Sequence, residues 1–300
     1  MPAEKTVIII AGPTAVGKTG IAIEVAKRLD TAIISADSRQ CYQGMCIGTA
    51  QPSEEQLQEV PHFFINEFPV TATLSAGDFE RLSLGYLDQI FKEKDTAVVC
   101  GGTGLYIRAL CGELDAMPPV DNAIFLRVNE DYKQQGLAWL QQYVQQEDPL
   151  FYAQADRDNP ARLLRALIFK LSTGDSILRY QSQPAKTPPF RIIKIGLELP
   201  REVLYARINQ RVADMLAAGL LEEVRALYPQ RGLKNLQTVG YTELFDFIAG
   251  TITLDQAMEQ IQQHTRNYAK RQLTWFRKDE AMRWFSATDA QVTKHITDLL

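Results

Sequence analysis

Residues 12–19 of the chain, GPTAVGKT, follow the G-x-x-x-x-G-K-[ST] pattern of a phosphate-binding loop. In such a loop, successive backbone N–H groups converge on an anion at the N-terminus of a helix. Lys18 adds a mobile cation, and the Thr19 hydroxyl can bind a Mg2+ ion carried by the phosphates. The pattern predicts a cradle for a phosphate ligand, formed by Gly12, Pro13, Thr14, Ala15, Val16, Gly17, Lys18 and Thr19.

The segments on either side of this loop have the patterns that a working cradle needs. Residues 7–11, VIIIA, are an apolar run typical of a buried strand, and residues 20–29 carry Ile21, Val25 and Leu29 at helical spacing. A chance glycine-rich turn would not need both flanking elements. We therefore predict a strand, loop and helix that bind phosphate, while the kind of phosphate ligand stays open.

Two other predicted strands end in polar residues. Asp37 follows the apolar run at residues 31–34, and Thr103 follows the run at 96–100 and two glycines. Ligands of open α/β sheets bind at the carboxyl ends of strands, and we expect the strand before Asp37 to neighbour the phosphate loop. Asp37 could bind Mg2+ through water or accept a proton, and Thr103 could orient a ligand. A turn aspartate and an ordinary helix N-cap are equally compatible with these patterns.

A single long helix is predicted over residues 202–228, with a core stripe at Leu204, Ile208 and Met215. Arg211 lies about 20 to 40° from this stripe at 100° per residue, so its guanidinium could face a buried anion. Alternatively, the aliphatic part of the Arg211 side chain could pack on the core while its guanidinium reaches solvent. None of the predicted strands ends in the aspartate that ATPases use to hold magnesium, unless Asp37 has that role, which weakens an ATP-hydrolysis interpretation.

The order of elements predicts an α/β fold: a P-loop NTPase-like parallel sheet core with an inserted all-helical subdomain. Strand-like runs at residues 7–11, 31–34, 96–100 and 192–199 alternate with helical patterns. Two proline-bearing stretches, 117–120 and 183–189, interrupt this alternation, and only helical periodicity lies between them. We expect a catalytic core at residues 1–117 and 190–300 and a helical insertion at 118–189.

Composition limits the classes of function. The net charge of −4 argues against broad coating of nucleic acid, so any nucleic-acid site must be a local patch. The four cysteines form no C-x-x-C pair and the three histidines lie far apart, which argues against a zinc site or a disulfide framework. The chain has neither a long apolar run nor a leader pattern, so we expect a cytoplasmic protein without a membrane partner.

Residues 264–278 form a basic run without an acidic residue. On a helix, Arg266, Lys270 and Arg277 share one face, and Ile261, Tyr268 and Trp275 share the opposite, anchoring face. A solvated charged face is the usual interpretation of such a run. The missing acids favour contact with a phosphate backbone.

Taken together, the motifs resemble those of the tRNA dimethylallyltransferase (tRNA isopentenyltransferase) family in its bacterial form, nearly end to end. The segments that carry the resemblance are GPTAVGKT at 12–19, DSRQ at 37–40, GMCIGTAQP at 44–52, PHF at 61–63, SAGDF at 75–79, GGTGLY at 101–106, DNPARLLRAL at 158–167, VGYTEL at 239–244 and TRNYAKRQLTWFR at 265–277. This chain departs from the family at Cys46, Gln51, Phe63, Asn66 and Ile168, and in the order Asp158-Asn159.

The resemblance implies a reaction. The cradle would hold the diphosphate of dimethylallyl diphosphate, with Mg2+ bound at Thr19, and the acceptor would be the exocyclic amine of the adenosine 3′ of the anticodon in tRNA. Lys18 and Arg211 would stabilise the leaving diphosphate. Asp37 would accept the amine proton, and Thr103 would orient the base or the diphosphate.

The same resemblance implies a tRNA-binding surface and a role for the insertion, which would clamp the anticodon loop around a flipped-out adenine. The residues expected to contact tRNA are Asp37, Ser38, Arg39, Gln40, Thr103, Arg127, Ala161, Arg162, Leu163, Leu164 and Arg165. We expect a monomer.

Two other functions fit parts of the chain. A small-metabolite kinase of the P-loop class would explain the loop and Asp37, but neither the insertion nor the basic run. A non-catalytic tRNA-binding homologue would explain the departures. A nucleoside triphosphate should stabilise a kinase, and an allylic diphosphate should stabilise a prenyltransferase. A non-catalytic homologue should bind tRNA without turnover.

Overall fold

The computed structural model of the chain describes residues 4–115, 117–180 and 186–300. Contacts divide it into a core unit, Met1–Gly112 with Thr187–Leu300, and a second unit, Glu113–Lys186. Of the proline-bearing stretch expected at 183–189, residues 183–185 lie outside the described residues. The part of the chain that the structure describes contains no helix long and apolar enough to cross a membrane.

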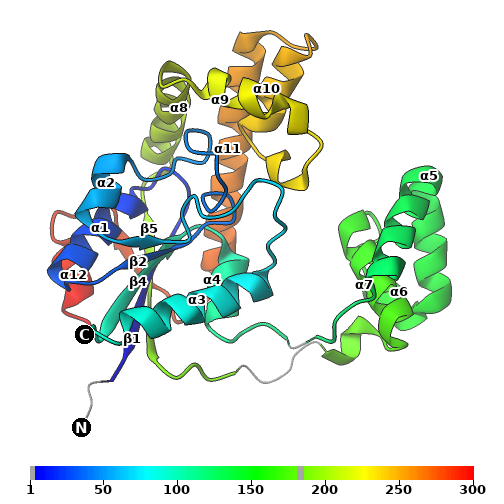
Figure 1. Cartoon of the computed structure of the whole chain (residues 1–300), viewed down its shortest axis with the longest axis horizontal. Helices are drawn as coiled ribbons and strands as arrows, with labels where there is room; N and C mark the ends of the chain where they lie inside the picture. The colour runs from blue at the N-terminus through cyan, green and yellow to red at the C-terminus, as the bar shows by residue number, and fades with distance from the viewer. Residues whose placement is uncertain (1–3, 116, 181–185) are drawn as a thin grey trace. The chain divides into compact units, whose positions relative to one another are not determined.

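The core unit is built on a parallel sheet with the strand order β3-β2-β4-β1-β5-β6 (Figure 1). The strands are β1 (Thr6–Ala11), β2 (Ile33–Ala36), β3 (His62–Phe63), β4 (Thr96–Gly101), β5 (Arg191–Glu198) and β6 (Arg283–Ser286). This confirms the predicted P-loop-like α/β class. The prediction that the strand before Asp37 neighbours the phosphate loop is wrong, because β4 pairs with both β1 and β2 and lies between them.

Both faces of the sheet are covered by helices, and β1 shows how one strand serves two cores. Val7, Ile9 and Ala11 face one apolar cluster, whereas Ile8 and Ile10 face the other, because successive side chains point to opposite faces. A strand that is buried on both faces appears in the sequence as a continuous apolar run.

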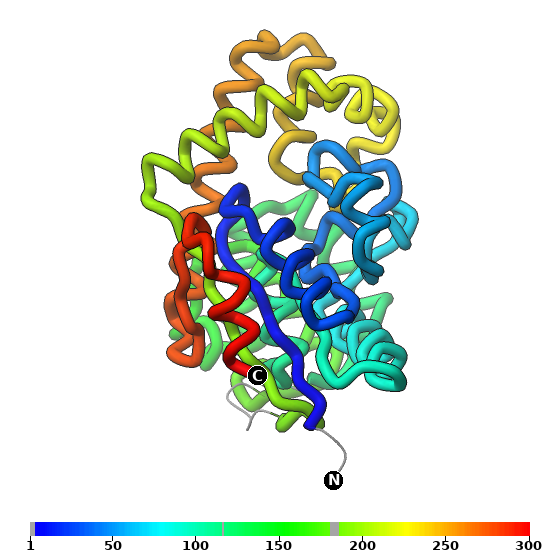
Figure 2. The backbone as a smooth tube through the Cα atoms, turned by 90° about the vertical axis from the view of Figure 1, so that its left-hand side faces the viewer, coloured from blue at the N-terminus to red at the C-terminus, as the bar shows by residue number. Residues whose placement is uncertain are grey.

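The two faces are covered by partly different helices. On the side of Ile8, α1 (Lys18–Arg28) and α12 (Val292–Thr297) pack side by side, and the N-terminal half of α8 (Arg201–Ala217) adds to the same cluster (Figure 2). The opposite cluster takes side chains from α3 (Ala76–Ile90), α4 (Gly104–Leu110) and α11 (Leu254–Phe276). Helices α8 and α11 contribute to both clusters. A short helix, α2 (Glu54–Glu59), precedes β3.

The single helix predicted over 202–228 is wrong. The chain forms α8, then breaks at Gly219, and continues as α9 (Leu220–Leu227). Gly219 has φ 100°, a left-handed conformation that suits glycine and ends a helix. Two 3-10 turns, Tyr228–Gln230 and Lys234–Leu236, and α10 (Tyr241–Ile248) lead to α11, which begins at a capping box of Thr253 and Gln256.

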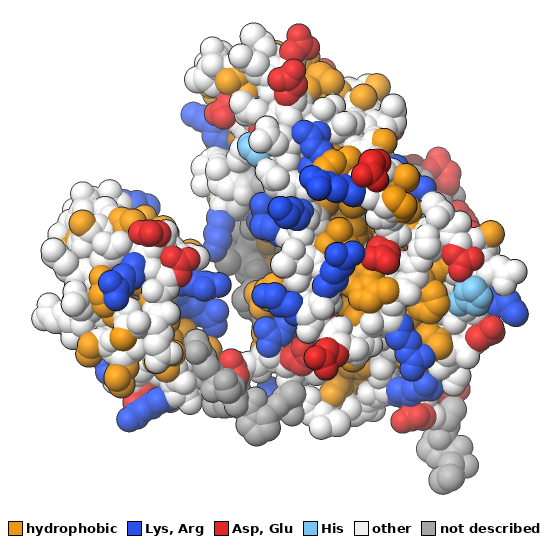
Figure 3. Space-filling model, turned by 180° about the vertical axis from the view of Figure 1, so that it is seen from behind, with side chains coloured by type: hydrophobic (Ala, Val, Ile, Leu, Met, Phe, Trp, Pro, Cys, Tyr) orange, Lys and Arg blue, Asp and Glu red, His pale blue; other side chains and the backbone are white. Residues whose placement is uncertain are grey.

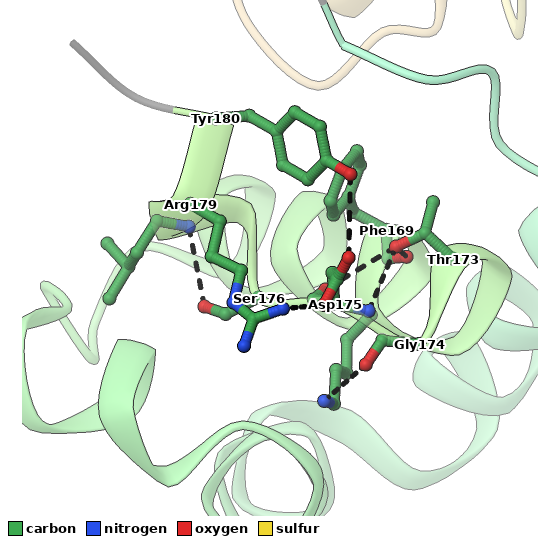
Figure 4. Close-up of polar contacts among 9 residues, drawn as sticks. Phe169, Thr173, Gly174, Asp175, Ser176, Arg179 and Tyr180 are labelled. Atoms are coloured by element: carbon green, nitrogen blue, oxygen red, sulfur yellow. Dashed lines mark hydrogen bonds and ion pairs between the residues drawn. The ribbon is translucent and has the colours of Figure 1, made fainter. Parts of the chain in front are cut away.

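The described residues of the second unit are helical, without a strand: α5 (Asn122–Glu147), α6 (Pro149–Gln154), α7 (Pro160–Thr173) and a 3-10 turn at Ile177–Tyr180. Helix α5 is kinked at Gly136, whose φ is 77°. Gly174 ends α7, and Thr173 Oγ1 accepts a hydrogen bond from the Asp175 N–H (3.2 Å), which turns the chain toward Tyr180 (Figure 4). The core of the second unit comprises Val128, Leu140, Val144, Leu163, Leu167 and Ile168.

Candidate active site

The phosphate loop opens onto a cavity of about 350 Å3 at the carboxyl end of the sheet. Parts of the core unit that are far apart in the sequence line it: the loop itself, Asp37 and Gln40 after β2, residues 49–52, and the end of β4. Helix α8 contributes Arg211, and α11 contributes Tyr268 and Gln272. Carboxyl ends of several parallel strands thus converge on the loop, as this class of sheet requires.

The loop can form only because two of its positions are glycine. Gly12 has φ 147°, and a Cβ there would lie 2.6 Å from the backbone oxygen of Leu197 on β5. Gly17 has φ 106° and occupies the N-cap of α1. The backbone therefore approaches β5 closely and then enters α1 at the point where N–H groups are available to an anion.

Lys18 lies in this cavity with its ammonium turned toward the loop. Nζ donates hydrogen bonds to the carbonyl oxygens of Gly12 (3.0 Å) and Pro13 (2.7 Å). The pKa of Lys18 is lowered from 10.5 to about 8, mainly by burial and also by the charge of Arg211, against the raising effects of Cys100 and Asp37. An anion in the cavity would favour the charged form of this lysine.

Arg211 faces the phosphate loop. Its Nη1 donates to Thr14 Oγ1 at 3.3 Å, and burial lowers its pKa. One turn earlier on α8, Arg207 Nη1 donates to the backbone oxygen of Val16 at 3.2 Å. Of the two interpretations that the sequence left open for Arg211, the geometry favours the guanidinium turned toward an anion site.

Asp37 forms a turn and also lines the cavity. Its Oδ1 accepts hydrogen bonds from the N–H groups of Arg39 (2.8 Å) and Gln40 (3.3 Å), as a turn aspartate does. The same side chain lines the cavity with Lys18 and Arg211. These two N–H donors fix the orientation of the carboxylate at the site.

Thr103 occupies the N-cap position of α4, but its side chain makes no capping hydrogen bond there. Its hydroxyl instead accepts a hydrogen bond from the N–H of Ser38 at 3.0 Å. Gly101 and Gly102 line the cavity, and Thr103 is not among its lining residues. The structure thus places Thr103 beside the Ser38 backbone, where it joins the end of β4 to the segment after β2.

A second cavity, of about 240 Å3, continues from the first and shares six lining residues with it: Thr14, Asp37, Thr49, Ala50, Arg211 and Tyr268. Its remaining lining is largely apolar and includes Val212, Met215, Leu220, Val239 and Ile261. Ser38 and Arg39 line it too. The site therefore has a cationic end at the phosphate loop and an apolar end, with Asp37 at their junction.

Gln272 is a site residue to which the sequence analysis assigned no role. It is only 6% exposed, its Oε1 accepts a hydrogen bond from the Thr14 N–H (2.8 Å), and its Nε2 donates to the Gly102 oxygen (2.9 Å). It therefore ties α11 to both the phosphate loop and the end of β4. The signal that could have found it is its position one turn after Tyr268 on the face predicted to be buried.

The basic run on α11 is less free than its sequence indicates. Arg277 forms an ion pair with Glu198 of β5 at 3.1 Å, and Arg266 donates to Asn209 Oδ1 at 2.7 Å. Trp275 is 42% exposed, so its prediction as an anchoring residue is wrong; Ala269, Gln272 and Phe276 are buried instead. Lys and Arg side chains of the core unit gather on the face seen in Figure 3.

Lys270 and Arg277 line a separate cavity of about 610 Å3 with Glu198, Arg201 and Tyr205, and none of these residues lines the phosphate-loop cavity. At 3.6 residues per turn, Lys270 and Arg277 project from the side of α11 opposite to Tyr268. The structure thus does not bring this basic stripe to the candidate site.

In the second unit, Arg162 and Arg165 line a cavity of about 360 Å3 with Asp115, Asp156 and Phe151. Asn159 caps α7 by accepting a hydrogen bond from the Arg162 N–H at 3.2 Å, which fixes this end of the helix. Leu163 is fully buried in the core of the unit, whereas Arg127 and Ala161 are exposed and Leu164 is partly buried.

Magnesium fits the residues of the phosphate-loop cavity. Mg2+ takes oxygen ligands and keeps several waters, so it is usually held by one or two protein groups plus substrate phosphates. The Thr19 hydroxyl and the Asp37 carboxylate line the same cavity and supply such groups. The described residues contain no cluster of three or more His, Cys, Asp or Glu that could hold a metal without a ligand.

Comparison with known proteins agrees with this geometry. A model of the IPP transferase family matches residues 40–279. A tRNA dimethylallyltransferase of Cytophaga hutchinsonii is 42% identical over 94% of this chain and 92% of its own length, and one of Christiangramia forsetii is 45% identical over 93% and 92%.

Solved structures show the same likeness. A tRNA isopentenylpyrophosphate transferase of Bacillus halodurans has a TM-score of 0.71 at 34% identity, covering 99% of this chain and 94% of that one. A eukaryotic dimethylallyltransferase acting on tRNA has a TM-score of 0.82 at 23% identity, over 98% of this chain and 77% of its own, and shows the fold alone. The family model matches most of the chain, and relatives are more than 40% identical across nearly the whole sequence. The chain therefore belongs to the IPP transferase family, the tRNA dimethylallyltransferases.

Proposed function

We propose that this enzyme transfers a dimethylallyl group from dimethylallyl diphosphate to the exocyclic amine of the adenosine 3′ of the anticodon in tRNA, releasing diphosphate. The observation that carries the proposal is the two-ended cavity, cationic at the phosphate loop and apolar beyond Asp37. A diphosphate suits the first end and a short branched hydrocarbon suits the second. The relatives from Cytophaga and Christiangramia are named for this reaction class.

In the proposed reaction, the allylic C–O bond breaks, a C–N bond forms, and negative charge develops on the leaving diphosphate. Lys18, the backbone N–H groups of the loop and Arg211 would stabilise that charge, because all of them face the phosphate end of the cavity. Mg2+, held by Thr19, would supply further positive charge to the diphosphate oxygens.

The amine must lose a proton when the new bond forms, and Asp37 is the residue proposed to accept it. Its carboxylate lies at the junction of the two cavity ends, and the N–H groups of Arg39 and Gln40 hold it in one orientation. Proton transfer by a positioned carboxylate needs this kind of fixed geometry. Thr103 would act on the orientation of this segment through its hydrogen bond from the Ser38 N–H.

Contacts to tRNA are proposed for residues 37–40 and for Arg127, Ala161, Arg162 and Arg165 of the helical unit, which we propose clamps the anticodon loop. Arginine side chains supply planar, permanently charged partners for phosphates. Leu163 and Leu164 would support the arginine-bearing face, since Leu163 is fully buried. We propose that the enzyme acts as a monomer, and in the cytoplasm.

The test is transfer of label from radiolabelled dimethylallyl diphosphate to a tRNA transcript. We expect labelled RNA with wild type, and none when the target adenosine is replaced by guanosine. Lys18→Ala should abolish labelling, whereas the matched control Lys27→Ala on the same helix should not, because Lys27 is exposed and pairs with Glu59. Transfer of phosphate from ATP to a small metabolite without labelled RNA would establish the kinase alternative instead.

A further inference from the structure

Glu223, on α9, forms an unusual set of hydrogen bonds with a distant loop. Its carboxylate accepts from three consecutive backbone N–H groups, those of Cys46 (2.8 Å), Ile47 (2.7 Å) and Gly48 (2.9 Å). Tyr241 adds a fourth bond by donating its hydroxyl at 2.6 Å. Consecutive N–H groups directed at one point form an anion site, and here the anion is the protein's own side chain.

The surroundings keep this contact in place. Tyr241 is fully buried, and burial together with the Glu223 carboxylate raises its pKa, so it remains a donor. A Cβ at position 48 would lie 2.6 Å from the Tyr241 ring, so only glycine allows the loop to approach it this closely. Loop, tyrosine and glutamate are thus packed together by shape as well as by hydrogen bonds.

The residues that follow this contact reach the candidate active site. Thr49 and Ala50 line both cavities, and their carbonyl oxygens accept hydrogen bonds from Gln40 Nε2 at 3.1 and 2.9 Å. Gln40 itself lines the cavity beside Asp37. A continuous path of hydrogen bonds and backbone therefore runs from Glu223 through residues 46–50 to Gln40.

We propose that Glu223 is a positioning residue: it anchors residues 46–50 and thereby holds Gln40 in place in the cavity wall beside Asp37. This inference rests on the proposed function, because Gln40 is a proposed tRNA contact. The phosphate end is held separately, by Gln272 on the Thr14 N–H and by the close approach of Gly12 to Leu197. Gln40, Thr49 and Ala50 line the same cavity, but the loop amides and Lys18 that would bind the diphosphate are not held by this anchor. Loss of the anchor should therefore weaken tRNA binding more than diphosphate binding.

The variant is Glu223→Gln, which keeps the size of the side chain but directs an NH2 group at N–H donors. We expect kcat/KM for tRNA to fall about tenfold, mainly through KM, because hydrogen bonds to a charged group are removed. Affinity for an unreactive allylic diphosphate analogue should stay within about twofold. The control is Glu222→Gln, at the preceding residue of α9. Glu222 is exposed, and its ion pair with Arg225 is long at 3.8 Å. This control variant should match wild type.

A double-mutant cycle separates positioning from general destabilisation. In a Gln40→Ala background the link to the loop is already cut, so Glu223→Gln should add little further loss in KM for tRNA. Additive effects, or equal losses of tRNA and diphosphate affinity, would overturn the inference. Hydrogen exchange provides a readout that is independent of the reaction: the amides of residues 46–48 should exchange faster in Glu223→Gln than in Glu222→Gln.

The two proposals fail in different ways. If wild type labels tRNA but Glu223→Gln matches it in KM and in exchange at residues 46–48, the positioning role is wrong and the proposed function stands. If wild type does not label tRNA, the proposed function fails, and unchanged exchange would then also refute the anchor.

Discussion

The pKa of Lys18 predicts how diphosphate affinity depends on pH. Burial lowers this pKa to about 8 in the free protein. A bound diphosphate would pair with the ammonium and raise the pKa again, so binding favours the protonated lysine. As the pH rises through 8, the free protein loses this proton, and binding must restore it. The contribution of Lys18 to the affinity should therefore fall on the alkaline side and stay nearly constant below pH 7.

The size of the effect follows from the same value. If the pKa of the complex lies well above 9, the dissociation constant scales as 1 + 10^(pH − 8), and it should be about tenfold larger at pH 9 than at pH 7. The ligand adds little to this change, because the last ionisation of a phosphate group lies near pH ~6 and is largely complete at pH 7.

The assay is titration calorimetry with an unreactive allylic diphosphate analogue at pH 7 and 9, in buffers of different ionisation enthalpy. At pH 9 the wild-type protein should take up close to one proton per ligand bound. The control is Lys18→Arg, whose guanidinium stays charged at both pH values, so its affinity should not fall. Equal pH dependence in wild type and Lys18→Arg, or none in wild type, would refute the assignment of Lys18 as the titrating contact.

Three further predictions address other parts of the site. Asp37→Asn should lower turnover about 100-fold or more while changing tRNA affinity only a few-fold, since an amide can keep the turn hydrogen bonds but cannot accept a proton; single-turnover kinetics would show it, and near-normal turnover would make Asp37 structural. Replacing Arg162 and Arg165 by Ala should flatten the log–log salt dependence of tRNA binding by roughly one unit for each phosphate that the two arginines neutralise, and spare the allylic diphosphate; an unchanged slope would remove these arginines from the RNA interface. Gln272→Ala leaves the Thr14 N–H and the Gly102 carbonyl without their partner, so urea denaturation should show a loss of about 2 to 4 kcal/mol, and a loss below ~0.5 kcal/mol would show that water replaces the side chain.

The local elements were predictable because each carries its own signal. The buried run before Gly12 predicted β1, and GPTAVGKT predicted the turn into α1, since glycine is required where φ is positive or the backbone approaches β5. The break between α8 and α9 was missed for a related reason. Gly219 stands within a helical pattern, and only its left-handed conformation shows that it ends the helix.

The order of strands across the sheet cannot be predicted from any local sequence pattern. The expectation that the strand before Asp37 neighbours the phosphate loop failed because β4, which comes later in the chain, lies between β2 and β1. Asp37 nevertheless reaches the phosphate loop. All strands of a parallel sheet end on the same edge, so a residue one strand further away still lines the same cavity.

The contacts that complete the site join residues far apart in the chain, and this is where sequence reasoning stops. Thr14 forms hydrogen bonds with Gln272 of α11 and Arg211 of α8. The sequence around each partner shows only on which helix face it lies. A face pattern predicts that a side chain is buried, but not what it contacts, because burial against carbon and burial against a polar backbone have the same periodicity.

The same distinction separates a prenyltransferase from a kinase built on one loop. Both need Lys18 and the loop amides, so the phosphate end alone does not choose between them. The choice depends on what lies beyond Asp37. There the lining gains an apolar wall of Val212, Met215, Leu220, Val239 and Ile261, beside the polar side chains of Ser38, Arg39, Thr238 and Thr265. An apolar wall next to a diphosphate cradle would shield a developing allylic cation from water while leaving the leaving group charged and bound. A short branched hydrocarbon fits against that wall, whereas phosphoryl transfer has no need of it.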